Sequence, residues 1–250
     1  MKTKICGLVP VYDNHMTIST VVTSLLERLD FVIVVDDGSS DGTEKIVDEL
    51  KRQLPRQVEV LHHPDNRGKG AAVQSGLQRA HAMGFTHAIQ VDADGQHNLD
   101  DLPKFLHGIE QHPQAMLLGA PVFDDDIPAI RKHGRKLTQL MIALEMGTWD
   151  VPDAMCGFRA YPVPAICKLG KMDPRMSFDP EVMIRAHWAG IPLQRIPTKV
   201  RYLAPEEGGI SHFRMVNDNI RHTWAHIRLL LQAPFRILFR AVTQAGDRTR

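Results

Sequence analysis

Apolar and polar positions alternate in blocks along the first half of the chain. Short apolar runs predict strands at Ile5–Val11, Phe31–Val35, Val58–Leu61, His87–Val91 and Ala115–Leu118. The amphipathic stretches between them predict helices at Thr17–Leu29, Thr43–Leu54, Ala71–Met83 and Leu102–His112. The uninterrupted apolar run Phe31–Val35 is typical of a parallel strand buried on both faces. Strands that alternate with helices predict an α/β fold with a mainly parallel central sheet flanked by helices.

The second half of the chain is less regular. Its pattern predicts helices over Ile130–Met146 and Pro180–Ala189, and strand-like segments at Cys156–Tyr161 and Gln194–Tyr202. The chain then ends in amphipathic helices. We therefore divide it into a body, residues 1–210, and a C-terminal helical extension, residues 211–250.

The extension carries apolar residues at helical spacing, which predicts two helices separated by Pro234. The first apolar face consists of Phe213, Val216, Ile220, Trp224, Ile227 and Leu231. The second consists of Phe235, Leu238, Phe239 and Val242. Arginines flank both faces at Arg214, Arg221, Arg228, Arg236 and Arg240. Such faces either pack on the body or lie on an anionic membrane surface, and the second helix favours the membrane.

The overall charge narrows the classes of partner. The 250 residues carry a net charge of +1, which argues against a nucleic-acid-binding protein because such proteins need a clustered surplus of cations. The charge is uneven, however: Ser211–Arg250 holds seven Arg and two Asp, so the extension is +5 and the rest of the chain −4.

Cysteine content and hydropathy point to a compartment. The three cysteines include no Cys-x-x-Cys pair, which favours a reducing environment over disulfides or a zinc site. No apolar run is long enough to span a bilayer. We therefore expect a cytoplasmic protein that is peripheral on the inner face of the membrane.

The strongest chemical motif is Asp92-Ala93-Asp94-Gly95-Gln96, directly after a predicted strand. In parallel sheets, ligands bind beyond the carboxyl ends of the strands. Two carboxylates at that place are typical ligands of Mg²⁺ or Mn²⁺, with Gln96 as a further oxygen ligand. A lone motif of this kind is more often an Asp-Gly turn. Its position beside other acidic loops favours the metal site.

Two further segments suit a nucleotide. Asp37 follows the second predicted strand and is not required to cap the next helix, so we expect it to accept hydrogen bonds from a nucleobase or ribose. Lys69 stands at the glycine-rich entry to a helix, where a phosphate is favoured. A simple glycine turn is the alternative.

In combination, these segments resemble the family 2 glycosyltransferases, and within them the polyprenol-phosphate mannosyl- and glucosyltransferase branch. The segments that carry the resemblance are Pro10–Asn14, Val35–Ser39, Arg67–Gly70, Asp92–His97 and Cys156–Arg159. The resemblance implies a GT-A fold and inverting transfer from a UDP-, GDP- or dTDP-sugar to a polyprenyl phosphate or another hydrophobic acceptor. It places Pro10, Tyr12, Asp13, Asp37, Lys69, Asp92 and Ala93 around the nucleotide, and Asp94 with Gln96 on the metal.

The acceptor side is predicted with alternatives. A hydroxyl acceptor needs a general base, for which Asp179 and Glu181 are candidates, whereas a phosphate acceptor needs none. Asp179 is also a natural helix cap, followed by Pro180. Arg131 and Arg135 share a helix face. The resemblance assigns such basic residues, together with Arg159, to the acceptor phosphate, although neighbouring aspartates could simply neutralise them. Ser211 and His212 resemble a mobile loop that closes over the donor.

Two other functions are compatible with the motifs. Val91-Asp92-Ala93-Asp94-Gly95 resembles the nucleophile loop of haloacid-dehalogenase-like phosphotransferases, although Gln96 stands where that loop has Thr or Val. The second alternative is a protein that binds nucleotide sugars without catalysis.

Overall fold

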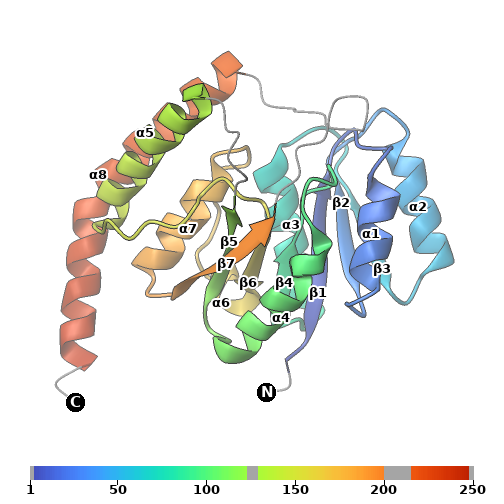
Figure 1. Ribbon diagram of the computed structural model, residues 1–250, viewed down its shortest axis with the longest axis horizontal. Coiled ribbons are helices and arrows are strands. Elements are labelled where there is room, and N and C mark those ends of the chain that lie inside the picture. The colour runs from blue at the N-terminus through green and yellow to red at the C-terminus, as the bar shows by residue number, and fades with distance from the viewer. Residues whose placement is uncertain (1–2, 123–128, 200–214, 248–250) are drawn as a thin grey trace.

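Seven strands form a single sheet in the computed structural model, which describes residues 3–122, 129–199 and 215–247 (Figure 1). The strand order is β3-β2-β1-β4-β6-β5-β7. The strands are β1 (Ile5–Val11), β2 (Val32–Asp36), β3 (Val58–His62), β4 (His87–Gln90), β5 (Met116–Val122), β6 (Arg159–Pro162) and β7 (Leu193–Lys199). All of them run in one direction except β6, which is antiparallel to both β4 and β5.

Helices cover both faces of this sheet. They are α1 (Ile18–Leu26), α2 (Thr43–Gln53), α3 (Lys69–Ala82), α4 (Leu102–Gln111), α5 (Ala129–Met146), α6 (Val163–Cys167), α7 (Phe178–Trp188) and α8 (Met215–Asp247), with a 3₁₀ turn at Leu99–Asp101. One apolar core joins the sheet to α1, α2 and α4. The other core joins it to α3, α5, α6, α7 and α8. The predicted α/β architecture with a mainly parallel sheet is thus confirmed.

The boundaries in the second half differ from the prediction. The strand expected at Cys156–Tyr161 begins only at Arg159, because the preceding segment is a loop. The short helix α6 follows β6 directly and was not expected. Residues 200–202 of the last expected strand lie outside the described residues.

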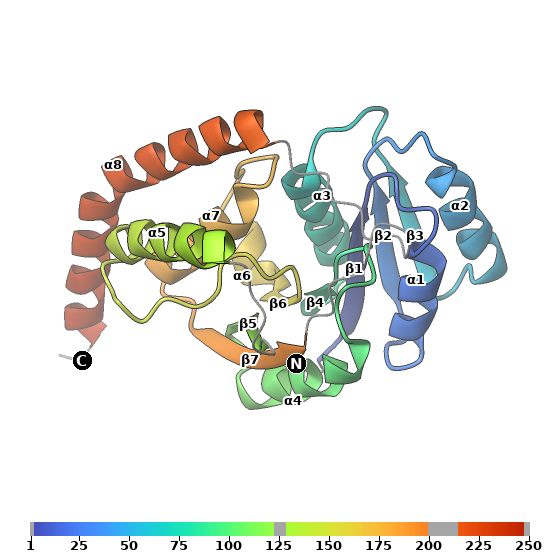
Figure 2. The same cartoon turned by 45° about the horizontal axis from the view of Figure 1, so that its top comes forward.

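The prediction of two C-terminal helices is wrong. A single helix, α8, continues through Pro234, and Figure 2 shows it changing direction along its length. Ala225, Leu229 and Ala233 bury one side of α8 against the body, and this packing holds the helix together across the missing backbone donor of the proline. Among the described residues, no helix is long and apolar enough to cross a membrane.

Candidate active site

Lys69 occupies the centre of the candidate site. It is the first residue of α3, and its Nζ lies 2.9 Å from the carboxylate of Asp92 and 3.1 Å from Oδ2 of Asp179. Asp92 comes from the loop after β4, whereas Asp179 comes from the first turn of α7. Three segments that are distant in the sequence therefore bring one ammonium group and two carboxylates together.

The electrostatics of this cluster favour its charged forms. Burial opposes the charge on Lys69, but Asp179 and Asp92 outweigh it and raise the pKa of the ammonium group. Burial likewise opposes the charge on Asp92, whereas Lys69 and His97 lower the pKa of that carboxyl below its ordinary value. Asp94 behaves differently, because burial and the charge of Asp92 raise its pKa. A further cation beside Asp94 would relieve this repulsion.

The donor atoms fit a divalent cation held jointly with a substrate. Asp92 and Asp94 offer carboxylate oxygens, and the backbone N–H of Gln96 donates a 3.0 Å hydrogen bond to Oδ1 of Asp94. Among the described residues, no three His, Cys, Asp or Glu side chains gather closely enough to hold a metal ion. Mg²⁺ and Mn²⁺ commonly use one or two carboxylates and complete their shell with substrate phosphates and water, so Asp92 and Asp94 would hold such an ion.

The loop after β1 lies against the loops after β2 and β4. The backbone N–H of Asp13 donates a 2.9 Å hydrogen bond to Oγ of Ser39, and Oγ1 of Thr17 donates one of 2.6 Å to the carbonyl of Ala93. The predicted nucleotide residues Pro10, Tyr12, Asp13 and Ala93 are thus on adjacent segments, as the parallel pairing of β1 with β2 and β4 requires.

The sequence suggested that the carboxylate of Asp37 is available to a nucleotide, but in the structure it is occupied by other partners. It is buried and accepts hydrogen bonds from the backbone N–H groups of Arg67, at 3.0 Å, and Gly68, at 2.6 Å. Nδ1 of His63 lies 2.6 Å from it. These bonds fix the turn that leads into Lys69, so Asp37 positions the centre of the site.

Arg159 is buried rather than exposed to an acceptor. Its side chain has no exposed surface. Its three nitrogens donate hydrogen bonds of 2.7 Å each to the carbonyls of Cys156, Asp179 and Ala154. The expected contact with an acceptor phosphate is therefore not compatible with this conformation. The guanidinium instead joins the loop before β6 to the start of α7, and Nη1 lies 3.4 Å from Oδ1 of Asp179.

Glu181 points away from this cluster. Its buried carboxylate accepts hydrogen bonds from the backbone N–H of Asp173 at 3.0 Å, from Arg185 at 3.1 Å and from Nη2 of Arg228 at 2.5 Å. Of the two predicted base candidates, only Asp179 therefore faces Lys69. The helix-cap alternative for Asp179 is also wrong, because Ser177 occupies the N-cap position and makes no side-chain cap.

The remaining acceptor residues cannot be placed. Ser211 and His212 lie outside the described residues. Arg131 and Arg135 belong to α5, but their side chains are not among those described. Their assignment to an acceptor phosphate and to a closing loop remains a prediction.

Comparison with known proteins identifies the family. The family described as glycosyl transferase family 2 matches residues 7–170, well over half of the chain. The chain belongs to this family. It is a glycosyltransferase, and this membership sets aside both the haloacid-dehalogenase-like alternative and the non-catalytic one.

Three relatives carry names that describe the formation of a lipid-phosphate sugar. A UDP-N-acetylglucosamine–dolichyl-phosphate N-acetylglucosaminyltransferase of Methanococcus voltae is 28% identical over 213 residues, 78% of this chain and 84% of its own. A dolichyl-phosphate beta-glucosyltransferase of Trichomonas vaginalis is 28% identical over 72% of this chain and 60% of its own. A polyprenol monophosphomannose synthase of Mycolicibacterium smegmatis is 30% identical, over 41% of this chain and 40% of its own.

Solved structures agree on the fold. A glucosyl-3-phosphoglycerate synthase of Mycobacterium tuberculosis bound to phosphoglyceric acid superposes with a TM-score of 0.65 at 16% identity, over 92% of this chain and 80% of its own. The same enzyme bound to Mn²⁺, UDP and glucosyl-3-phosphoglycerate superposes with a TM-score of 0.62 at 17% identity, covering 95% and 80%. The glycosyltransferase thus has the GT-A fold.

Several residues of the site were missed by reasoning from the sequence. Oη of Tyr161 donates a 2.8 Å hydrogen bond to Oε1 of Gln90, and Nε2 of Gln90 lies 3.3 Å from Oδ1 of Asp92. Gly157 lies so close to Asp92 that a Cβ would overlap the carboxylate. Burial raises the pKa of the neighbouring Cys156 thiol to about 11, which keeps this thiol protonated near neutral pH. Cys156 and Gly157 lay within the recognised segment Cys156–Arg159, whereas Gln90 and Tyr161 lay outside the recognised segments.

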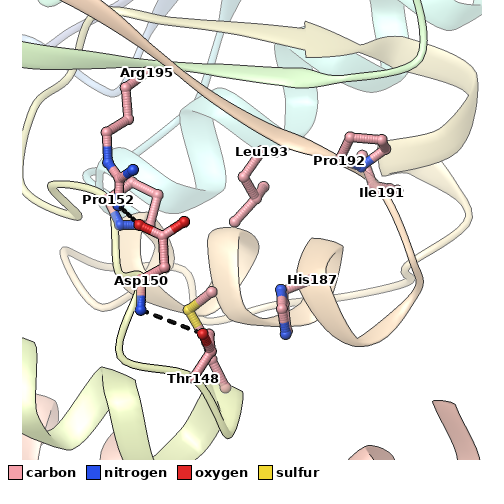
Figure 3. Close-up of a pocket in the computed structure, with 9 residues that line it drawn as sticks. Thr148, Asp150, Pro152, His187, Ile191, Pro192, Leu193 and Arg195 are labelled. Atoms are coloured by element: carbon pink, nitrogen blue, oxygen red, sulfur yellow. Dashed lines mark hydrogen bonds and ion pairs between the residues drawn. The ribbon is translucent and has the colours of Figure 1, made fainter. Parts of the chain in front are cut away.

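The glycosyltransferase also has a pocket that is separate from the Lys69 cluster. Figure 3 shows it beside the C-terminal part of α7, where Arg195 pairs with Asp150. It is lined by Met146, Thr148, Asp150, Pro152, His187, Ile191, Pro192, Leu193 and Arg195. Since Leu193 begins β7, this pocket is at the amino edge of the sheet, opposite Lys69 and Asp92. It takes no part in the candidate site.

Proposed function

We propose that this glycosyltransferase transfers a sugar, with inversion, from a nucleotide sugar to the phosphate of a membrane lipid. The observation that carries the proposal is the position of Lys69, whose ammonium group lies between Asp92 and Asp179. The lipid-phosphate substrates in the names of the relatives support the acceptor, and the UDP complexes of the structural neighbours support a uridine nucleotide as the first donor to test.

The reaction exchanges one bond at the anomeric carbon. An oxygen of the acceptor attacks this carbon, the bond to the diphosphate breaks, and the nucleoside diphosphate leaves with the electron pair. A fixed positive charge near the leaving group stabilises the transition state. Lys69, at the N-terminus of α3, provides that charge together with the backbone N–H groups of the helix.

A divalent cation would be held by Asp92 and Asp94. When bound, it supplies Lewis-acid stabilisation of the departing diphosphate. Asp37 and the turn at Arg67–Gly68 keep Lys69 in place beside it, because the turn is fixed by hydrogen bonds from two backbone N–H groups.

The role of Asp179 depends on the acceptor. A phosphate acceptor is already ionised, so no proton has to be removed and Asp179 serves to orient Lys69. A hydroxyl acceptor would instead give up its proton to this carboxylate. We favour the first role, because the carboxylate of Asp179 lies between Lys69, 3.1 Å from Oδ2, and Arg159, 3.4 Å from Oδ1, and so is well placed to orient the ammonium group.

The test is transfer of radiolabel from UDP-, GDP- and dTDP-sugars, with Mg²⁺ or Mn²⁺, to a polyprenyl phosphate. We expect label to enter the organic phase with one donor class, and no transfer to the matching polyprenol, which lacks the phosphate. Transfer to the polyprenol alone would contradict the phosphate acceptor. Absence of transfer, and of thermal stabilisation by any of the three nucleotides with metal, would contradict the proposal as a whole.

A further inference from the structure

The two sides of α8 differ in exposure. On the side toward the body, Leu229 is 1% and Ala233 3% exposed. The opposite side carries a row of large apolar residues at three- and four-residue spacing, which we call the outer stripe: Trp224 at 68%, Ile227 at 40%, Leu231 at 72%, Phe235 at 78% and Leu238 at 66% exposed. The packing of α8 on the body therefore leaves its larger apolar face without a partner among the described residues.

The neighbouring helix also exposes apolar side chains. Helices α5 and α8 pack side by side, as both Figure 1 and Figure 2 show. Leu140 and Leu144, one turn apart on α5, are 44% and 51% exposed. A row of large exposed apolar side chains such as the outer stripe marks a site of protein or membrane association.

The charges beside the stripe select the partner. Residues 222–238 contain two arginines, Arg228 and Arg236, two histidines and no acidic residue. A second copy of the chain docking stripe to stripe would bring these cations together without a carboxylate from this segment between them. Arg228 already pairs with Glu181, so anionic lipid headgroups complement Arg236, and the acyl region accepts the large apolar side chains.

We propose that the outer stripe of α8 is the surface through which the protein lies on an anionic lipid bilayer. The helix lies in the plane of the interface, with the stripe below the headgroups and Arg236 among the lipid phosphates. The outer stripe would thus hold the enzyme at the membrane that contains its acceptor. The proposal rests on the proposed function only in assuming that the acceptor is a lipid.

The docked helix contacts α7, the helix whose first turn carries Asp179. Arg228 of α8 is half exposed and donates the 2.5 Å hydrogen bond to Glu181, which stands two residues after Asp179 on α7. The bilayer surface and α7, the helix that carries Asp179, are thus joined through the ion pair of Arg228 with Glu181. A lipid phosphate held in this plane is delivered to the side of the molecule that carries α7.

The test is co-sedimentation of the full-length protein with phosphatidylcholine vesicles, with and without phosphatidylglycerol, in the absence of donor, acceptor and metal. We expect stronger binding to the anionic vesicles. The double variant Leu231→Ser/Phe235→Ser should lose about tenfold or more in binding, because two large apolar side chains no longer enter the interface. The matched control is Gln232→Ser, at an exposed position of the same helix, which should bind like the wild type.

The role of charge is tested with Arg236→Gln. It should weaken binding to anionic vesicles about fivefold and leave the weak binding to neutral vesicles unchanged. In a Trp149→Phe background, quenching of Trp224 fluorescence by brominated lipids reports insertion of the stripe, since the other tryptophan, Trp188, is buried.

Two outcomes would overturn the docking surface. The first is unaltered vesicle binding by the Leu231→Ser/Phe235→Ser variant. The second is a dimer in sedimentation equilibrium that this variant converts to a monomer, which would assign the stripe to a second copy of the chain. Because these vesicles contain no acceptor, loss of sugar transfer with intact vesicle binding would contradict the proposed function alone.

Discussion

Two acidic pairs with the same spacing behave differently in this molecule. Asp92 and Asp94 follow strand β4 and share one environment, as the effect of the Asp92 charge on the pKa of Asp94 indicates. Asp179 and Glu181 occupy the first turn of α7 and face different partners. Asp179 faces Lys69, whereas Glu181 faces Arg185 and Arg228.

The difference follows from backbone geometry. Asp92 and Asp94 lie on either side of Ala93, where the chain turns after β4, whereas residues two apart on an α-helix project about 200° apart. The same spacing therefore builds a shared ligand site after a strand and separates a site residue from a structural one on a helix. The following predictions test this division, from the largest expected effect to the smallest.

Asp94→Ala should lower transfer activity about a thousandfold, because the substitution removes one of the two carboxylates proposed to hold the divalent cation near the developing charge of the diphosphate. The repulsion between the two carboxylates disappears with it, so thermal stability should be unchanged or slightly higher. Steady-state kinetics and a melting curve check both. Activity close to the wild type would remove Asp94 from the metal site.

Asp179→Asn and Glu181→Gln separate the members of the second pair. We expect Asp179→Asn to lose activity about a hundredfold, because Lys69 loses one of its two carboxylates. Glu181→Gln should retain kcat within about threefold and instead lower the free energy of unfolding by about 1–2 kcal/mol, because a buried charged acceptor is lost. Equal losses of kcat in both variants would show that the pair acts as one unit.

The pH profile of the wild type sharpens the role of Asp179. With a phosphate acceptor, no proton is removed from the acceptor. The pH dependence of kcat should therefore have the same shape in the wild type and in Asp179→Asn. A limb that the variant abolishes would instead identify Asp179 as a general base acting on a hydroxyl.

Gly157→Ala tests how tightly the first pair is enclosed. A Cβ at this position overlaps the carboxylate of Asp92, so the carboxylate or the loop before β6 has to move. A displacement of about 1 Å is sufficient to lower activity about a hundredfold. The affinity for nucleotide, measured by calorimetry without metal, should change much less.

The control is Gly190→Ala, whose Cβ meets nothing nearby. Its positive φ makes it a control for backbone strain, and the variant should keep full activity.

Glu145→Gln should give the smallest effect, on the pH dependence of stability. Burial raises the pKa of Glu145 above 4.5, although His226, with Nδ1 at 2.7 Å, opposes the shift. A raised carboxyl pKa means that stability falls as pH rises from 4.5 through the raised value. A glutamine at this position does not titrate, so the variant does not lose stability in this way. The free energy of unfolding of the variant should therefore rise relative to that of the wild type as the pH increases from 4.5 through the raised pKa. Urea unfolding at several pH values measures it, and parallel profiles for the two proteins would contradict the prediction.

The sequence predicted the parallel half of the fold and the first acidic pair well, because both depend on local pattern. The buried run at Val32–Asp36 and the polar residues after β1, β2 and β4 needed only strand periodicity and the rule about carboxyl edges. The direction of β6 could not be predicted, since the apolar pattern of a strand does not record its orientation.

The second acidic pair required information that the sequence does not contain. Which of Asp179 and Glu181 faces the site depends on where α7 begins and on the arrival of Arg228 from α8, forty-seven positions later in the chain. The burial of Arg159 likewise depends on carbonyls from two separate segments. Pro234 predicted a helix break, but packing of Leu229 and Ala233 on the body outweighed the local preference.

The pairing of β4 with β6 has a consequence for the order of folding. Neighbouring strands β1 and β2 pair Gly7 with Val32, which closes a loop of roughly 25 residues, whereas Gln90 pairs with Arg159 across roughly 70. Closing the longer loop costs more chain entropy. This cost favours early assembly of the β1–β2–β3 unit and later docking of β6. The contact of Tyr161 with Gln90 depends on this long closure, so the support beneath Asp92 forms after the β1–β2–β3 unit.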